Sequence, residues 1–324
     1  MSYPVQLTQS LTTKSGIPIT FGTGTGTKWQ WLKKGRGEDH QGTIDQNLVD
    51  LILLAIESGF NHIDTAEFYT TQPEVGAALA QTDKKREDLF ITTKYSPGHS
   101  KFPALSNGPK EFFRKALKDL GTSYIDLVMI HHPFFNAESP NSFGYSLGSA
   151  WKELVDLKKE GLIRYLGVSN YGVKHLEETF AAVDHNPEYY PIVDQIEFHP
   201  YLQSQSVGIH EFAAKHNILI EAYGPLTPLF RLKKKNDEGK EEFLTHPLQE
   251  LLPVLSSKYS KTDAQILLRY TYQKGILPVT TSSQRQRLID ALDVVNFELE
   301  QSDIDEIDKV GASFHYRGFF EGLF

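Results

Sequence analysis

No cysteine occurs among the 324 residues of the chain. Its absence excludes disulfides, zinc–thiolate sites, iron–sulfur clusters and catalysis by a thiol. Basic residues are also fewer than acidic ones, 33 against 41, which gives a net charge of −8. This balance argues against nucleic acid or an anionic membrane surface as the main partner, although a local cluster of cations can still bind an anionic cofactor.

Long apolar runs are missing too. The longest lies around residues 48–56, is bounded by Asp50 and Glu57, and is far too short to cross a membrane. Residues 1–20 are polar, and we find no secretory signal in them. Because 40% of the residues are hydrophobic and 23% are charged, we expect a globular, cytoplasmic protein with a large core.

Short apolar runs alternate along the chain with longer stretches of helical spacing. Eight runs predict strands, several of them apolar on both faces as buried parallel strands are. They comprise residues 17–21, 60–64, 89–94, 125–131, 163–168, 192–196, 218–223 and 276–279. The predicted helices comprise residues 44–58, 74–80, 110–120, 151–160, 174–183, 208–216, 248–258 and 287–295.

This alternation predicts an α/β fold, a (β/α)8 TIM barrel that forms a single domain over residues 1–324. A doubly wound sheet is the alternative fold. The surplus residues form extended loops and a C-terminal tail, at residues 29–46, 133–149, 226–244 and 311–324. The second and third of these follow predicted strands four and seven, so we expect them at the C-terminal face, where barrel active sites lie.

Three successive predicted strands end in an ionisable residue. These residues are Asp64, Lys94 and His131, and Tyr69 lies in the loop that follows Asp64. A charged group at the end of an apolar strand is costly unless it has a partner. Because the ends of successive strands adjoin in a barrel, we expect the four side chains to converge.

Such a group suits proton donation to a carbonyl oxygen while a hydride reaches the carbon. A buried Lys94 ammonium beside Tyr69 would lower the pKa of the phenol from about 10. Asp64 would keep the lysine charged, and His131 would hold the carbonyl oxygen. The alternative is a structural Asp64–Lys94 ion pair with a surface tyrosine, but four such residues on one rim favour catalysis.

Two further patterns resemble binding motifs, but a structural interpretation is favoured for both. His131 and His132 adjoin, but neighbouring side chains of a strand point to opposite faces and make a poor chelate, so we expect no metal. The run from Gly22 to Gly26 lacks the third glycine and the immediate helix of a dinucleotide-binding motif. We interpret it as a glycine-rich loop at the mouth of the barrel.

Five motifs resemble the aldo-keto reductases, which are NAD(P)H-dependent barrel enzymes, and among them the yeast-type NADPH-dependent ketoreductases. The motifs are His62-Ile-Asp64-Thr-Ala-Glu-Phe-Tyr69, Leu127-Val-Met-Ile-His131, Gly167-Val-Ser-Asn170, Asp194-Gln-Ile-Glu-Phe-His-Pro200 and Glu221-Ala-Tyr-Gly-Pro225. The resemblance covers about residues 17–295. It implies that Tyr69 is the general acid, that Lys94 and Asp64 tune it, and that His131 orients the carbonyl group.

The same resemblance implies a cofactor site. Ser169, Asn170 and Gln195 would hold the nicotinamide carboxamide, and Tyr223 would stack on the ring. Further cofactor contacts are assigned to Gly26, Thr27, Lys28, Gly224, Pro225, Leu226, Thr280, Thr281, Ser282 and Arg287.

The region of the adenosine phosphate departs from the family pattern. Pro278 is followed by Val279 where many members have a lysine, whereas Arg287 matches the family arginine across a segment about two residues longer. Arg285 is an extra candidate. Hydroxyl groups near a helix N-terminus can bind phosphate. We therefore expect NADPH rather than NADH.

The substrate pocket is expected to be aromatic. Trp29, His132 and Phe134 are assigned to it, together with Phe68, Phe135 and the tail residues Tyr316, Phe319 and Phe320. His132 stands where family members have an aromatic residue. The run Lys233–Lys235 is interpreted as a solvated loop, with a flap over the pyrophosphate as the alternative.

These observations predict an NADPH-dependent reductase that converts aldehydes and ketones, keto esters included, to alcohols by hydride transfer, with Tyr69 as general acid. The alternatives are a nucleotide-binding regulatory subunit with little turnover and a metal-dependent barrel hydrolase. The expected partner is a small carbonyl substrate. We expect a monomer, with a homodimer as the alternative.

Overall fold

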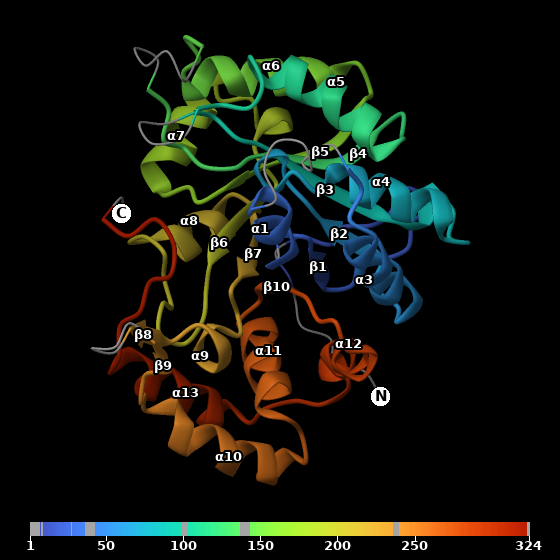
Figure 1. Ribbon diagram of the computed structural model, residues 1–324. Helices are drawn as coiled ribbons and strands as arrows, with labels where there is room; N and C mark the ends of the chain where they lie inside the picture. Colours follow the sequence, from blue (N-terminus) through green and yellow to red (C-terminus); the bar gives the residue numbers. More distant parts are fainter. Residues whose placement is uncertain are drawn as a thin grey trace.

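Eight parallel strands close into a barrel in the order β1-β10-β7-β6-β5-β4-β3-β2 (Figure 1). The computed structural model describes residues 7, 9–26, 28–35, 43–98, 103–136, 143–235 and 240–322. The barrel strands are β1 (Gly22–Gly24), β2 (His62–Asp64), β3 (Phe90–Tyr95), β4 (Ile125–Ile130), β5 (Ile163–Ser169), β6 (Val193–Glu197), β7 (Leu219–Tyr223) and β10 (Leu277–Thr280). The predicted TIM barrel is confirmed, and its closure excludes a doubly wound sheet.

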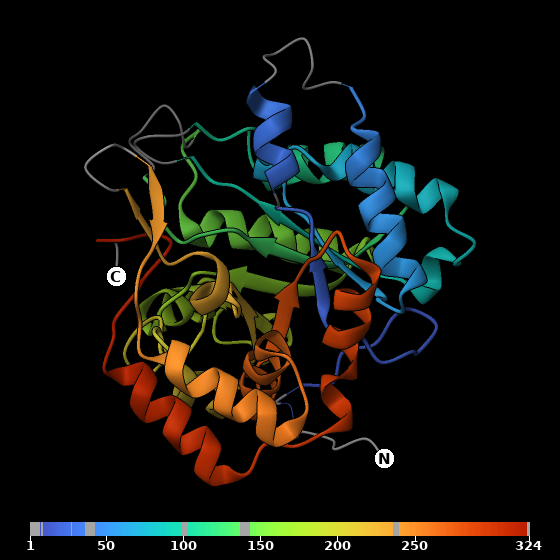
Figure 2. The same cartoon turned by 60° about the horizontal axis from the view of Figure 1, so that its bottom comes forward.

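Helices surround the barrel; most lie between successive strands, and α12 and α13 follow the last strand (Figure 1). They are α1 (Lys28–Gly35), α3 (Gln46–Glu57), α4 (Gln72–Gln81), α5 (Pro109–Leu120), α6 (Leu147–Lys159), α7 (Val173–Ala182), α8 (Ile209–Lys215), α9 (Thr227–Phe230), α10 (Leu248–Tyr259), α11 (Asp263–Gln273), α12 (Arg285–Leu292) and α13 (Gln301–Ala312). A hairpin of β8 (Lys233–Lys235) and β9 (Glu241–Phe243) rises with α1 from the same end of the barrel (Figure 2). Within the described residues, no helix is long and apolar enough to cross a membrane.

The two faces of each barrel strand pack into different layers. On β4, Val128 and Ile130 belong to the apolar layer under the helices, whereas Leu127 and Met129 belong to a second cluster with Phe21. Because side chains alternate along a strand, Leu127 and Met129 lie on the opposite face of β4, toward the barrel interior. Polar residues lie closer to the C-terminal ends of the strands, where Asp64 ends β2 and Ser169 ends β5.

The prediction of the first strand at residues 17–21 is wrong. Pro18 forms an isolated antiparallel bridge with Thr12, and the barrel strand comes just afterwards, at Gly22–Gly24. A Cβ atom at Gly22 would lie 3.0 Å from Val279 and 3.1 Å from His62. Close approach of the two neighbouring strands therefore favours glycine at Gly22, and the apolar pattern of a strand is missing from this segment.

Several elements were missed. Helix α11 begins at a capping box, in which the Thr262 hydroxyl accepts from Gln265 N at 3.2 Å and Gln265 Oε1 accepts from Thr262 N at 3.0 Å. That Thr-x-x-Gln signal was available in the sequence. Residues 233–235, interpreted as a loop, form strand β8, and Lys233 pairs with Glu241 on β9 at 3.1 Å.

Candidate active site

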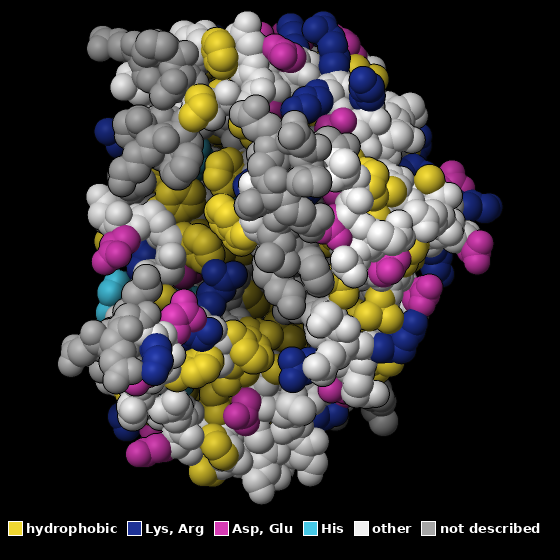
Figure 3. All heavy atoms as spheres, in the orientation of Figure 1, with side chains coloured by type: hydrophobic (Ala, Val, Ile, Leu, Met, Phe, Trp, Pro, Cys, Tyr) yellow, Lys and Arg dark blue, Asp and Glu magenta, His cyan; other side chains and the backbone are white. Residues whose placement is uncertain are grey.

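The four residues predicted to converge meet at the C-terminal end of the barrel. Asp64 ends β2, Lys94 lies on β3 and His131 directly follows β4, while Tyr69 ends the short 3-10 helix η1 (Glu67–Tyr69). Asp64, Tyr69 and His131 line a cavity of about 580 Å³, and Lys94 is buried behind them. Figure 3 shows hydrophobic side chains gathered around a hollow at the centre of this face.

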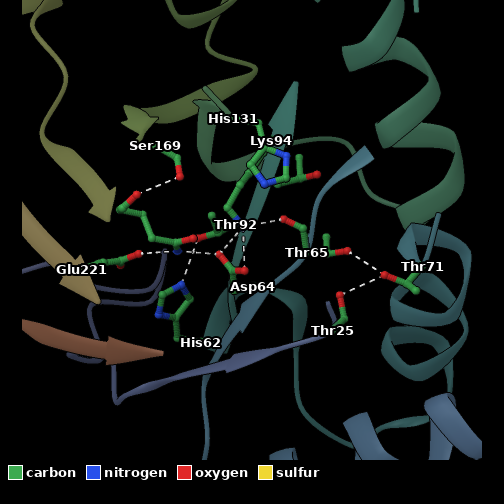
Figure 4. Close-up of polar contacts among 12 residues, drawn as sticks. Thr25, His62, Asp64, Thr65, Thr71, Thr92, Lys94, His131, Ser169 and Glu221 are labelled. Carbon is green, nitrogen blue, oxygen red and sulfur yellow. Dashed lines mark hydrogen bonds and ion pairs between the residues drawn. The ribbon is translucent and has the colours of Figure 1, made fainter. Parts of the chain in front are cut away.

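Lys94 is held by an ion pair (Figure 4). Its ammonium lies 2.6 and 2.7 Å from the two carboxylate oxygens of Asp64 and 3.0 Å from the carbonyl oxygen of Thr65. These three acceptors match its three protons. Burial lowers the pKa of Lys94, but the carboxylate of Asp64, with smaller contributions from neighbouring groups, outweighs burial and holds this pKa above its usual value. The lysine is therefore a fixed cation.

Tyr69 lies between this cation and the histidine. Its ring centroid is 5.2 Å from the Lys94 ammonium and 5.5 Å from the His131 ring, which it meets edge-on. Burial raises the pKa of Tyr69 by more than Lys94 lowers it, so the predicted lowering is wrong. The phenol keeps its proton at neutral pH, which is the form that a proton donor requires.

His131 is neutral and oriented by its neighbours. Burial and the Lys94 charge hold its pKa well below the usual value. Its Nδ1 lies 3.1 Å from the Ser96 hydroxyl, and Nε2 has no hydrogen-bond partner among the described residues. The sequence interpretation missed Ser96, although it lies two positions after Lys94 and so on the same side of an extended chain.

A second buried carboxyl group is linked to the first. The Gln195 amide nitrogen donates to Asp64 Oδ2 at 2.9 Å and to Glu221 Oε2 at 3.0 Å (Figure 4). Burial, followed by the charge of Asp64, raises the pKa of Glu221 to about 8. Burial also lowers the pKa of His62 to about 4. Glu221 was not predicted, although an acidic residue in the middle of a buried strand was a signal for it.

The predicted nicotinamide residues form one network across the ends of β5, β6 and β7. The Ser169 hydroxyl donates to the backbone oxygen of Gln195 at 2.8 Å and accepts from the Asn170 amide at 3.0 Å. The Tyr223 hydroxyl donates to Asn170 Oδ1 at 2.6 Å. All four residues line the main cavity, and Gln195 Oε1 lacks a protein partner in the described part of the chain. An amide donor of a ligand fits this acceptor.

A second cavity, of about 310 Å³, adjoins the first. The two share Leu226, Phe230, Thr280 and Thr281. Ser282 and Arg287 line only the second. Arg285 pairs with Glu57 at 2.5 Å, whereas Arg287 makes no ion pair among the residues that the structure describes. The combined cleft therefore has an aromatic inner end at Tyr223 and an arginine at its outer end.

The cleft offers polar groups that a ligand can engage. The buried Thr227 hydroxyl lines the main cavity without a hydrogen-bond partner, so a ligand atom can satisfy it. Gly26 lies against Tyr69, where a Cβ atom would come within 2.9 Å of the ring. Within the described ranges, no group of three potential metal ligands occurs.

The remaining predicted residues are only partly placed. Gly26, Gly224, Pro225, Leu226 and His132 line the main cavity. Thr27 lies outside the described residues, as do the side chains of Lys28 and Trp29, whose backbone begins α1.

Phe134 does not line the cavity but stacks on His132, with centroids 5.6 Å apart. Phe319 and Phe320 of the tail line the cavity, and Phe135 and Tyr316 do not. Residues lining the cavity that were not predicted include Gln30, Trp31, Ser96 and Arg231.

Fold and site together define a TIM-barrel enzyme, with a buried proton-donor group beside a long ligand-binding cleft. The model of the Aldo/keto reductase family matches residues 18–312. An NADPH-dependent alpha-keto amide reductase of Saccharomyces cerevisiae is 40% identical over 296 residues, which cover 91% of this chain and 88% of the relative. An NAD/NADP-dependent indole-3-acetaldehyde reductase of Schizosaccharomyces pombe is 35% identical over 310 residues, which cover 95% and 96%.

A solved structure gives the same answer. The aldo-keto reductase of Bombyx mori in complex with NADP superposes with a TM-score of 0.70 at 25% identity, over 95% of this chain and 94% of that one. The chain belongs to the aldo/keto reductase family. It is an oxidoreductase of this family, whose members reduce carbonyl groups with nicotinamide cofactors.

Proposed function

We propose that this protein reduces aldehydes and ketones, keto esters and keto amides included, with NADPH, and that Tyr69 donates the proton. The observation that carries the proposal is the position of Tyr69, between the Lys94–Asp64 ion pair and a neutral His131 on the wall of the main cavity. A phenol with its proton, next to a fixed cation, is arranged to lose that proton only when a strong base develops beside it.

The reduced nicotinamide supplies a hydride to the carbonyl carbon when it is bound. The chain's residues act on the carbonyl oxygen. Tyr69 transfers its proton to this oxygen as negative charge develops there, and the Lys94 ammonium stabilises the phenolate that remains. His131 donates from Nε2 and holds the oxygen within reach of Tyr69, because Nδ1 already faces Ser96. Asp64 fixes the lysine and neutralises its charge while the site is at rest.

The cofactor would be held along the cleft. Tyr223 would support the nicotinamide ring, and Ser169, Asn170 and Gln195 its carboxamide, as the free acceptor on Gln195 supports. Hydroxyl groups of Thr280, Thr281 and Ser282 would face the adenosine end.

Arg287 would meet the 2′-phosphate. Its lack of an ion pair among the described residues and the NADPH dependence in the name of the Saccharomyces relative support NADPH over NADH. The Schizosaccharomyces relative is named for both cofactors, so the preference needs a direct measurement.

The test measures oxidation of NADPH and NADH, in parallel, by the loss of absorbance of the reduced cofactor. The panel contains aldehydes, α-keto esters, α-keto amides and simple ketones, with Tyr69→Phe as the control variant. We expect turnover with NADPH that Tyr69→Phe abolishes. Turnover with NADH alone would overturn the cofactor assignment. Tight cofactor binding without turnover on any carbonyl compound would instead support the regulatory subunit.

A further inference from the structure

The C-terminal tail forms a wall of the main cavity. In Figure 1 it runs from α13 past the β8–β9 hairpin. Phe319 and Phe320 line the cavity. Phe319 meets the Tyr223 ring edge-on at 5.2 Å, and Phe320 lies 6.0 Å from the His132 ring and 5.5 Å from the Phe134 ring. The tail thus places aromatic surface on both the nicotinamide-facing and the loop-facing sides of the cavity.

One buried carboxylate holds this part of the tail. Glu197, the last residue of β6, accepts from Gly318 N at 2.8 Å and from Phe319 N at 3.1 Å, one bond on each carboxylate oxygen. His199 Nε2 lies 3.2 Å from the first oxygen and must be the donor, because a carboxylate only accepts. Glu197 is fully buried.

The contact is specific to this point of the tail. A Cβ atom at Gly318 would lie 3.0 Å from Glu197 Oε1, so a side chain there would push the carboxylate away. The residues just before it are tied to backbone oxygens, Tyr316 N to Tyr201 at 3.1 Å and Arg317 to Gln205 at 2.7 Å. Glu197 is the side chain that fixes the last step before Phe320.

We propose that Glu197 is a positioning residue that latches the tail over the active site and thereby selects carbonyl substrates with a flat, apolar substituent. The substrate selection rests on the proposed carbonyl reduction, whereas the attachment of the tail to Glu197 rests on the contacts given above. Without the carboxylate, the N–H groups of the exposed Gly318 and the partly buried Phe319 lose their acceptor, and water replaces it once the tail undocks. The aromatic wall formed by Phe319 and Phe320 then leaves the site.

The first measurement follows the latch directly. The Arg317–Gly318 peptide bond is a trypsin site inside the latch, and its cleavage releases residues 318–324, which mass spectrometry quantifies. We expect release to be about tenfold faster in Glu197→Gln than in the wild type, as the loss of one hydrogen bond to a charged group implies. In Glu197→Gln, the side-chain amide NH2 faces one of the two tail N–H groups, which therefore has no acceptor. Glu250→Gln, an exposed acidic residue on α10, is the matched control and should cleave like the wild type. Equal rates in Glu197→Gln and wild type would overturn the latch.

The second measurement follows selectivity. For an aryl keto ester, we expect KM in Glu197→Gln to rise about tenfold with kcat nearly unchanged, and for a small aliphatic aldehyde we expect both to stay within about twofold. A chain that ends at Arg317 should show the same rise in KM for the aryl keto ester. Adding Glu197→Gln to that shortened chain should not change the ratio of the two KM values any further. Faster release of the tail with unchanged substrate discrimination would overturn the proposed role of the tail in substrate selection.

The two arms separate this inference from the proposed function. Absence of turnover with every carbonyl compound would defeat the proposed function, while the cleavage rates would still decide the latch. If Glu197→Gln fails to fold, the shortened chain alone decides the selectivity, because unchanged discrimination in it would overturn the role of the tail.

Discussion

The proposed catalytic rim and the outer part of the proposed cofactor cleft use polar side chains in opposite ways. On the rim, at the ends of β2, β3 and β4, the ammonium of Lys94 has three protein acceptors, and both oxygens of Asp64 are engaged. In the cleft, Arg287 has no ion pair within the described part of the chain, and the buried Thr227 hydroxyl has no partner.

This difference separates what folding organises from what a ligand organises. The rim is assembled by contacts between neighbouring strands, so its geometry is in place before any substrate arrives. The cleft leaves the Thr227 hydroxyl and Arg287 for a ligand to engage, so a ligand that binds there would stabilise the fold. Rim substitutions should therefore change turnover or the stability of the protein, and cleft substitutions should change affinity.

The largest effect is expected from Tyr69→Phe. The substitution removes the proposed proton donor and keeps the ring that packs on His131. Turnover should fall by about 10²- to 10⁴-fold, the usual contribution of general acid catalysis. The Kd of NADPH, measured by fluorescence quenching, should stay within about twofold. Turnover close to the wild type would refute the mechanism, and a large loss of NADPH affinity would show that rim and cleft are not separable.

Glu221→Gln tests the stability of the rim. The pKa of Glu221 is raised from 4.5 to about 8 in the folded protein, so the folded state binds an extra proton between these values. Wild-type stability should therefore fall as pH rises from about 4.5 to about 8, by at most about 1.4 kcal/mol per pH unit from this group. Urea unfolding across this range should show a shallower fall in the variant. Parallel curves for variant and wild type would contradict the raised pKa.

Arg287→Ala addresses the cleft, with Arg285→Ala as its matched control. Arg287 is unpaired among the described residues and faces the outer cavity, whereas Arg285 is paired with Glu57. Loss of a hydrogen-bonded charge contact of about 1.5–3 kcal/mol should raise the Kd of NADPH roughly 10- to 100-fold. The Kd of NADH should not change, and Arg285→Ala should change neither. Equal losses for the two cofactors would place Arg287 away from the 2′-phosphate.

The barrel was predictable from the sequence because eight short apolar runs alternate with helical stretches, and several of these runs are apolar on both faces as buried parallel strands are. The first barrel strand, Gly22–Gly24, carries no apolar run, and at Gly22 the neighbours Val279 and His62 leave little room for a side chain. The convergence of Asp64, Lys94 and His131 was predictable for a related reason, since the ends of successive strands meet on one rim.

Other features depend on the packed structure. The pKa of Tyr69 is the sum of burial and the Lys94 charge, which oppose each other, and only the structure shows that burial is larger. The engagement of Arg285 by Glu57 joins residues 228 positions apart. Helix α11 was predictable from the sequence, because the capping box at Thr262 is a local sequence signal.

The smallest effect is expected from Ser96→Ala, which tests whether a hydroxyl group or the strand geometry orients His131. Ser96 lines the main cavity, and its hydroxyl lies 3.1 Å from Nδ1 of His131. If that hydroxyl donates to Nδ1, the proton of the neutral ring stays on Nε2, where the carbonyl oxygen needs it. Its removal should lower kcat/KM by about 3- to 10-fold, the value of one neutral hydrogen bond, and Ser96→Thr should restore it. Nitrogen NMR of His131 should show a larger share of the Nδ1-protonated tautomer in Ser96→Ala alone. An unchanged tautomer would mean that the strand geometry, and not the hydroxyl, orients the histidine.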